Sequence, residues 1–248
     1  ASIKNYIGFD GREGEAKGNV NAFREGRGIR GLFMTSKGVD PDSEQWGTMA
    51  LTTTASRVTF KRSWSEERRK RLLHFWDDLS EDGRLDDVSY APQDAPVGSL
   101  AAEVAIPAGG EEEITFLLTW HFPNRQTWTP GNSGEECGCA GDRLGNYYAT
   151  QYRDAWDVAE SVASQLADLE ETTLGFVHAF LGSDLPSQVK EAALYNLSTL
   201  RTQTCFRTED GRFFGWEGCS DDRGCCLGSC THVWNYEQAT AFMFGELA

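Results

Sequence analysis

The sequence predicts two kinds of structure in one chain, an antiparallel β-sandwich followed by a mainly helical region. Two observations support this prediction. Short runs rich in Thr, Val, Phe and Met, separated by turn residues, cover most of residues 28–128, which is typical of sandwich strands. From residue 154, apolar residues recur instead at steps of three and four, the period of a helix with one buried face. The 248 residues suffice for one large domain or parts of two.

The first half of the chain is expected to be built mainly from strands. Residues 1–30 are rich in glycine and charge and are expected to form loops between short strands. The strands expected after them are Gly28–Ser36, Gly47–Thr54, Arg57–Trp64, Ser99–Ile106 and Glu113–Phe122. Because Pro107–Gly110 is rich in turn-forming residues, we expect the last two strands to form a hairpin.

One helix is expected between these strands. Ser65 is its expected N-cap and Gly83 its expected end. Four residues spaced three or four apart should form its apolar face: Leu72, Phe75, Trp76 and Leu79. We interpret the basic run Arg68–Arg71 as a solvated helix face balanced by nearby acidic residues, in preference to an anion site.

The second half begins with the Gly- and Cys-rich loop Gly131–Gly145 and continues with helical patterns. Asp154 is expected to cap a long helix that ends at Gly182. Pro186 suits the first turn of a second helix. The buried stripe of this second helix should be Leu185, Val189, Ala193, Leu197 and Leu200.

A β-hairpin and a last helix complete the predicted elements. Asp210–Gly211 between aromatic runs predicts the turn of the hairpin. The last helix should begin near Thr231 and is apolar on nearly every face, so we expect it to be buried. No cap or stop closes it at Ala248, and the chain opens at Ala1 without an initiating Met. We therefore expect the chain to be a truncated piece of a longer protein.

Composition and charge narrow the possible functions. The formal net charge of −15 argues against a nucleic-acid-binding protein, which needs a basic surface. No apolar run approaches the ~20 residues of a membrane span. The seven cysteines are an odd number in a chain too long to need disulfide stapling. A reducing compartment follows from this, and we expect a cytoplasmic location.

Glu217 is the candidate catalytic residue. It lies between Trp216 and Gly218, after a predicted strand and before a Gly- and Cys-rich loop. A carboxylate beside aromatic rings and flexible glycines can approach a substrate closely, as the nucleophile of a glycosidase must. From residue types alone, an ion pair with Arg212 or Arg223 is the simpler interpretation of this glutamate.

The residues after Glu217 raise the alternative of a metal site. The possible ligands are Cys219, Cys225, Cys226, Cys230 and His232, with Cys137 and Cys139 earlier in the chain. Their spacing lacks the paired C-x-x-C of a zinc ribbon, and adjacent cysteines fit one tetrahedral ion poorly. We expect packing thiols in preference to zinc or a disulfide, and no catalytic metal. A catalytic Cys230–His232 pair is disfavoured because residues two apart do not face each other on a helix.

Three segments carry a resemblance to a known family. They are LPSQVKEAALYNLSTLRTQTCFRTEDGRFFGWEG with the later THVWNYEQATAFMF, FLLTWHFPNR at residues 116–125, and NYYATQYRDAWDVAE. The first resembles the opening of the catalytic domain of glycoside hydrolase family 116, which includes non-lysosomal (bile-acid) glucosylceramidases and microbial β-glucosidases. The other two resemble a late strand of that family's N-terminal sandwich and the passage into its first long helix. The order of the elements carries this resemblance more than any single motif.

The resemblance implies roles for particular residues. Arg212–Gly218 matches the RFG-aromatic-LEG-type segment that holds the family's nucleophile, so Glu217 is expected to be the nucleophile. Thr231–Val233 matches a Thr-x-Asp-Val segment whose acid contacts sugar hydroxyls, with His232 in place of that acid. The residues expected to bind the sugar are Thr231, His232, Trp216 and Trp234. The loop between these segments departs from the family pattern, which suggests a divergent subgroup.

The resemblance also implies an architecture and an activity. Residues 1–150 should be a partial β-sandwich, 151–182 a linker helix, and 183–248 the truncated start of an (α/α)6 toroid. The parent is expected to be a retaining exo-β-glycosidase acting on a β-glucoside or glycolipid, with no metal or organic cofactor. Its acid/base aspartate should lie beyond Ala248, so this chain alone is expected to be inactive. Two other classes stay open, a non-catalytic carbohydrate-binding protein and a cysteine-based metal-binding structural module.

Overall fold

The computed structural model describes residues 1–9, 16–65, 67, 69–88, 90–126, 143–202, 205–215, 218–220, 223–224 and 238–246. Its backbone divides into two units. Unit 1 comprises residues 1–123 and 152–165, and unit 2 comprises residues 124–151 and 166–248. Among the helices of the described residues, none is both long and apolar enough to cross a membrane.

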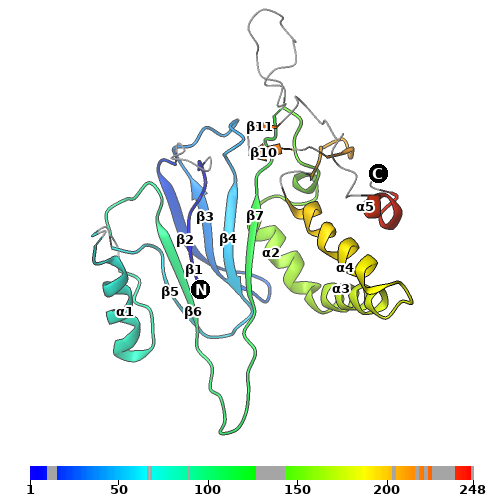
Figure 1. The fold of residues 1–248 in the computed structure, drawn as a ribbon. Coiled ribbons are helices and arrows are strands. Elements are labelled where there is room, and N and C mark those ends of the chain that lie inside the picture. Colours follow the sequence, from blue (N-terminus) through cyan, green and yellow to red (C-terminus); the bar gives the residue numbers. More distant parts are fainter. Residues whose placement is uncertain are drawn as a thin grey trace, which may run out of the picture. The chain divides into compact units, whose positions relative to one another are not determined.

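Unit 1 is built from two antiparallel sheets (Figure 1). The four-stranded sheet has the order β2-β3-β4-β7, and the three-stranded sheet has the order β1-β6-β5. The strands are β1 Ser2–Lys4, β2 Asn19–Glu25, β3 Arg30–Ser36, β4 Thr48–Thr53, β5 Val58–Lys61, β6 Val97–Ala102 and β7 Phe116–His121. The predicted β-rich first half is therefore confirmed, and residues 1–30, expected to be largely loops, contribute β1 and β2.

The two sheets pack face to face around one apolar core. Leu32 and Met34 of β3 and Leu51 of β4 meet Leu100 of β6 in this core. The rings of Phe23 on β2 and Phe60 on β5 stack across it, with centroids 4.1 Å apart. This is the arrangement of a β-sandwich.

Helix α2 (Ala155–Ser164) covers the other face of the four-stranded sheet. Phe33 and Ala50, which alternate with the core residues on β3 and β4, pack against Trp156 and Ala159. Both faces of these strands are thus buried, which explains their nearly continuous apolar sequence. Figure 1 shows α2 beside β7.

Hydrogen bonds fix the start of α2 to the sheet. The carboxylate of Asp154 accepts the amides of Trp156 and Asp157 at 2.8 and 2.9 Å, so the predicted N-cap is confirmed. The Thr119 hydroxyl donates to the Ala155 carbonyl at 2.7 Å. The buried His121 ring lies 2.9 Å from the Tyr152 carbonyl.

The predicted hairpin between residues 99 and 122 is wrong. Its turn exists, since the Gly110 amide donates to the Pro107 carbonyl at 2.9 Å. However, β6 pairs with β1 and β5, whereas β7 pairs with β4 in the other sheet. The long connection therefore crosses between sheets, because the pairing partners of both strands lie elsewhere in the chain.

The helix predicted from Ser65 is shorter than expected. Helix α1 is Arg71–Asp82, with Lys70 at its N-cap position and no side-chain cap. Ser65 instead accepts the amide of Glu67 at 3.3 Å in the preceding turn. Gly83 ends the helix in the left-handed conformation, as predicted.

The predicted apolar face of α1 is only partly correct. Phe75 stacks on Trp64, with centroids 4.7 Å apart, and the half-buried Leu79 shares this side. Leu72 and Trp76 are more than half exposed. The inward side is completed by Asp78, which forms an ion pair with Lys61, so a polar contact takes the place of an apolar one.

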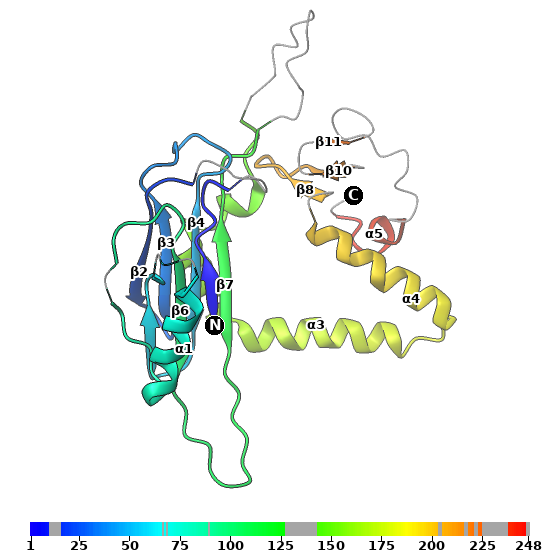
Figure 2. The ribbon, with the colours of Figure 1, turned by 60° about the vertical axis from the view of Figure 1, so that its left-hand side comes forward.

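Unit 2 contains the helices that follow α2. The expected single helix from Asp154 to Gly182 is interrupted at Gln165, and its second part is α3 (Leu166–Leu181). Figure 2 shows α3 and α4 (Ser187–Asn196) joined by a turn, with Pro186 at the N-cap position of α4. The 3-10 helix η2 (Leu197–Arg201) continues from α4.

The expected buried stripe of the second helix is wrong for the described residues. Leu185 and Val189 are 42% and 48% exposed, and no residue of α4 is buried. An apolar stripe is buried only where another element packs on it, and its spacing alone does not supply that element. Of the last predicted helix, residues 231–237 lie outside the described residues, and α5 (Gln238–Met243) is helical.

Candidate functional site

The predicted hairpin is confirmed in unit 2. Strands β8 (Cys205–Arg207) and β9 (Phe213–Gly215) pair antiparallel, with Phe206 opposite Phe214. These two rings stack with centroids 5.4 Å apart. Gly211 closes the turn with φ of +90°, a conformation that favours glycine. The local Asp-Gly signal was therefore sufficient to locate this element.

An ion pair and side-chain hydrogen bonds stabilise the hairpin turn. The Arg212 guanidinium contacts the Asp210 carboxylate at 2.6 and 2.7 Å, and the Thr208 hydroxyl donates to the same carboxylate at 2.6 Å. The Arg212 side chain first, and then the Thr208 hydroxyl, hold the pKa of Asp210 well below its usual range. The carboxylate of Asp210 is therefore ionised at neutral pH.

This turn bears on the alternative interpretation of Glu217. Arg212 was one of the two arginines with which Glu217 was expected to pair if it were structural. Its guanidinium is instead held by Asp210, two residues away in the same turn. Because Glu217 lies outside the described residues, its role as nucleophile and its pairing with either arginine both stay predictions.

A second segment, residues 143–150, lies along the hairpin. Asn146 forms a β-bridge with Thr208, and Arg143 pairs with Glu209 at 3.3 Å. The Arg207 guanidinium lies over the ring of Tyr147, 3.7 Å from its centroid. Tyr147 begins the 3-10 helix η1 (Tyr147–Thr150), so the hairpin and this helix form one packed group.

The group borders an open cavity of about 610 Å³. Aromatic rings and arginines dominate its lining: Arg125, Tyr147, Tyr148, Arg201, Phe206, Arg207 and Phe213. Arg125 is stacked over Phe206, 3.9 Å from the ring centroid. Guanidinium groups held flat on aromatic rings are pre-oriented, so this cavity presents rigid donors beside apolar faces.

All five predicted site residues lie outside the described residues: Trp216, Glu217, Thr231, His232 and Trp234. The same is true of Glu237, the rival carboxylate. The structure describes the backbone on both sides of Glu217. Gly215, at the end of β9, lies two residues before Glu217. Gly218 follows Glu217 directly and begins β10 (Gly218–Ser220), which pairs with β11 (Arg223–Gly224).

The alternative metal site also lies mostly outside the described residues. This holds for Cys137, Cys139, Cys225, Cys226, Cys230 and His232, whereas Cys219 lies in strand β10. Within the described part of the chain, no group of three or more His, Cys, Asp or Glu side chains is arranged to hold a metal ion.

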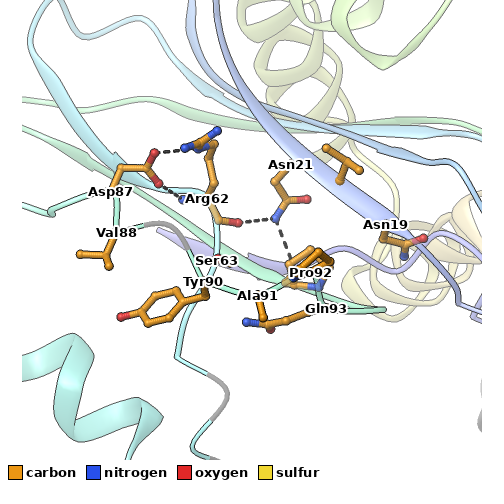
Figure 3. A pocket seen from close by; sticks show the side chains of 12 residues that line it. Asn19, Asn21, Arg62, Ser63, Asp87, Val88, Tyr90, Ala91, Pro92 and Gln93 are labelled. Carbon is orange, nitrogen blue, oxygen red and sulfur yellow. Dashed lines mark hydrogen bonds and ion pairs between the residues drawn. The ribbon is translucent and has the colours of Figure 1, made fainter.

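A second cavity, a groove of about 220 Å³ in unit 1, was missed by the sequence analysis. Figure 3 shows Asn21 of β2 near the backbone of Arg62, with Asp87, Tyr90 and Gln93 around them. These residues come from three separate stretches of the chain and form no motif. The only sequence signal was the presence of Asn19 and Asn21 in a strand whose other residues are mostly apolar.

The comparisons with known proteins define the class of protein. A family model described as "beta-glucosidase 2, glycosyl-hydrolase family 116 N-term" matches residues 1–169. The match covers the whole β-sandwich and α2, and it identifies a glycoside hydrolase domain. The chain belongs to glycoside hydrolase family 116, as the resemblance implied. No protein in the curated comparison matches the chain.

Proposed function

We propose that this chain is part of a retaining exo-β-glycosidase that hydrolyses a β-glucoside or glycolipid through a glycosyl-enzyme intermediate. Membership of glycoside hydrolase family 116 is the observation that carries the proposal. The confirmed β8–β9 hairpin adds support, because it provides the strand after which the family motif places its nucleophile.

Glu217 is the proposed nucleophile. Its carboxylate attacks the anomeric carbon and forms an ester as the bond to the leaving oxygen breaks. An acid protonates that oxygen, and the same group, now a base, later takes a proton from the water that hydrolyses the ester. Retaining enzymes hold these two carboxyl groups ~5–5.5 Å apart. In this proposal the acid/base is an aspartate beyond Ala248, so the chain alone does not turn over substrate.

The remaining roles follow the motif. Thr231 and His232 contact sugar hydroxyls, and Trp216 and Trp234 offer stacking faces. Residues 1–150 act as the sandwich domain, 151–182 as a linker helix, and 183–248 as the start of an (α/α)6 toroid. The proposed chemistry requires no metal or organic cofactor, and the reducing compartment indicated by the cysteines favours the cytoplasm.

The cavity beside the hairpin suits the leaving-group side of the substrate. Phe213 lines this cavity and precedes Glu217 by four residues. Four extended residues span at most ~14 Å, so the cavity lies within the reach of a glycoside bound at Glu217. Its aromatic and guanidinium lining favours an aglycone that combines an apolar face with hydrogen-bond acceptors.

Substitution of Glu217 tests the proposal in the full-length protein. Glu217→Gln keeps the shape of the side chain but removes the nucleophilic carboxylate, so turnover of an aryl β-glucoside should fall by about 10⁴-fold or more. The matched control is Glu209→Gln, which removes an exposed carboxylate from the same hairpin and should keep near-normal turnover.

A covalent label identifies the nucleophile directly. An activated 2-deoxy-2-fluoro-β-glucoside should form a stable ester with Glu217, found by mass spectrometry of the labelled peptide. A label on Glu237, or near-normal turnover by Glu217→Gln, contradicts the assignment. Binding of the glycoside without any turnover by the full-length protein would favour the non-catalytic carbohydrate-binding alternative.

A further inference from the structure

The groove in unit 1 is built by parts of the chain that are far apart in sequence. One wall comes from β2 with Asn19 and Asn21, and the other from the segment that follows α1, with Asp87, Tyr90 and Gln93. Arg62 lies between them, just after β5. We propose that this groove is a binding site for a single neutral sugar ring, separate from the site at Glu217 and independent of its role.

The charges of the groove cancel. Arg62 donates its backbone amide to one oxygen of Asp87 at 2.8 Å and its guanidinium to the other at 2.6 Å. These are the two charged residues of the described lining, and Figure 3 shows them joined. A phosphate would meet the Asp87 carboxylate, and a cation would meet the Arg62 guanidinium. A neutral ligand therefore fits this lining best.

The size of the groove limits the ligand. Its volume of about 220 Å³ lies below the ~300–1,000 Å³ of pockets for drug-sized ligands. One ring with its substituents fits this space, whereas an oligosaccharide or a lipid chain does not. The groove is open to solvent, so it also accommodates a ring at the end of a longer glycan or glycolipid.

The lining combines apolar faces with hydroxyl-binding groups. Pro92, Val88 and the half-buried ring of Tyr90 supply apolar surface. Within the described part of the chain, the hydroxyls of Ser63 and Tyr90 form no hydrogen bonds. Sugar rings have the same division, with C–H faces and an edge of hydroxyls, so aromatic rings and polar side chains recognise them together.

The floor of the groove is rigid. Asn5 donates to the side-chain oxygen of Asn21 at 3.0 Å, and Asn21 in turn donates to the Arg62 carbonyl at 2.8 Å. Gln93 is held by a bond of 2.6 Å to the Trp64 carbonyl, which leaves its amide oxygen as an acceptor. These bonds give the amides structural roles and also hold them in place for a ligand, which lowers the entropic cost of binding.

One buried hydrogen-bond acceptor near the groove has no partner among the described residues. Asn19 is only 5% exposed, and its amide nitrogen bonds to Ile7 at 2.8 Å. Its side-chain oxygen has no partner among the residues that the structure describes. This oxygen is itself closed to solvent, so it belongs to the packed floor of the groove and does not meet a ligand directly.

Titration of the isotope-labelled 248-residue chain with methyl β-glucoside tests the inference. The side-chain amide signals of Asn19, Asn21 and Gln93 should shift together and saturate in the millimolar range. Tyr90→Ala should weaken binding roughly 5-fold or more by removing the stacking face. The control is Tyr195→Ala, which removes a tyrosine that is 70% exposed in unit 2 and should leave the affinity unchanged.

Each outcome decides the inference. Sorbitol, an open-chain polyol, and inorganic phosphate should leave the three amide signals in place, and equal shifts with either probe would overturn it. Unchanged amide signals at saturating glucoside would also overturn it. Shifts confined to unit 2 and abolished by Glu217→Gln would refute the second site while supporting the proposed catalytic site. The backbone spectrum of each variant verifies that it is folded.

Discussion

Replacement of Asp78 by Asn should destabilise unit 1, because it breaks a buried ion pair. Lys61 of β5 is 4% exposed in its side chain, and its ammonium lies 3.0 Å from a carboxylate oxygen of Asp78 on α1, which is 16% exposed. Lys61 also donates to the Asp86 carbonyl. Asp78→Asn keeps the volume and one acceptor oxygen, but it leaves a buried ammonium without its counter-charge.

The expected loss can be estimated from this burial. Removing one partner of a buried ion pair costs about 3–5 kcal/mol. Asp78 keeps some exposure, so we take the lower end, about 3 kcal/mol. With a urea dependence of about 2 kcal/mol per M, the midpoint of urea unfolding should fall by roughly 1.5 M. Tryptophan fluorescence reports this transition, since Trp64 stacks on Phe75 of the same helix.

Two further variants test the reasoning. Asp77→Asn changes the exposed neighbouring carboxylate on α1 and should cost less than about 0.5 kcal/mol. Lys61→Met in the Asp78→Asn background removes the stranded charge and should recover most of the loss. Equal midpoints for Asp78→Asn and Asp77→Asn would show that the Lys61–Asp78 pair does not hold α1 on the sheet.

The other predictions concern a cap and a turn. Asp154→Ala should destabilise α2 by about 1–2 kcal/mol in urea unfolding, because two helix amides lose their acceptor. The control is Asp184→Ala, at an exposed site before α4. Equal losses of stability in the two variants would contradict the capping role of Asp154. The pKa of Asp210 is lowered, so its stabilising effect is full above the usual carboxyl pKa of about 4 and is lost as pH falls through the lowered value. The protection of the Gly211 amide, measured against its intrinsic exchange rate at each pH, should therefore stay high at pH 4 and fall below it. In Asp210→Asn this protection should be low at every pH.

The elements predicted correctly depend on neighbouring residues. Asp154 caps α2 through amides two and three residues ahead, and Gly83 ends α1 by donating to the Leu79 carbonyl at 2.9 Å. The β8–β9 turn likewise forms within Thr208–Arg212. Each of these contacts requires only the local chain, so the sequence alone contains the information that determines it.

The errors concern partners that are distant in sequence. Ser99 of β6 pairs with Ser2, and Thr119 of β7 pairs with Ala50. The Pro107–Gly110 turn forms with either pairing, so it did not reveal that β6 and β7 enter different sheets. On α1, Asp78 lies on the inward side because it pairs with Lys61 of the separate strand β5. The spacing of residues along α1 gives no indication of that partner.

The candidate sites differ in the same way. Glu217 was found through a contiguous family motif, and from residue types alone it was an ordinary glutamate. The groove has no such motif, because Asn19 of β2, Arg62 after β5 and Gln93 before β6 become neighbours only in the folded chain. Only the structure was able to reveal it.

The buried asparagines connect the fold to this groove. Asn5, Asn19 and Asn21 are at most 6% exposed, in a core where apolar side chains would avoid the cost of burying amides. Their bonds explain part of the arrangement, since they join the end of β1 to β2 and to the Arg62 backbone. Asn19 also keeps a buried side-chain oxygen without a partner among the described residues. Its amide nitrogen donates to Asn5 and Ile7, and a neutral side chain that donates two hydrogen bonds is an amide, which always brings a carbonyl oxygen. The unfilled acceptor therefore follows from the donor network, and that network holds Asn21 and the Arg62 backbone where they line the groove.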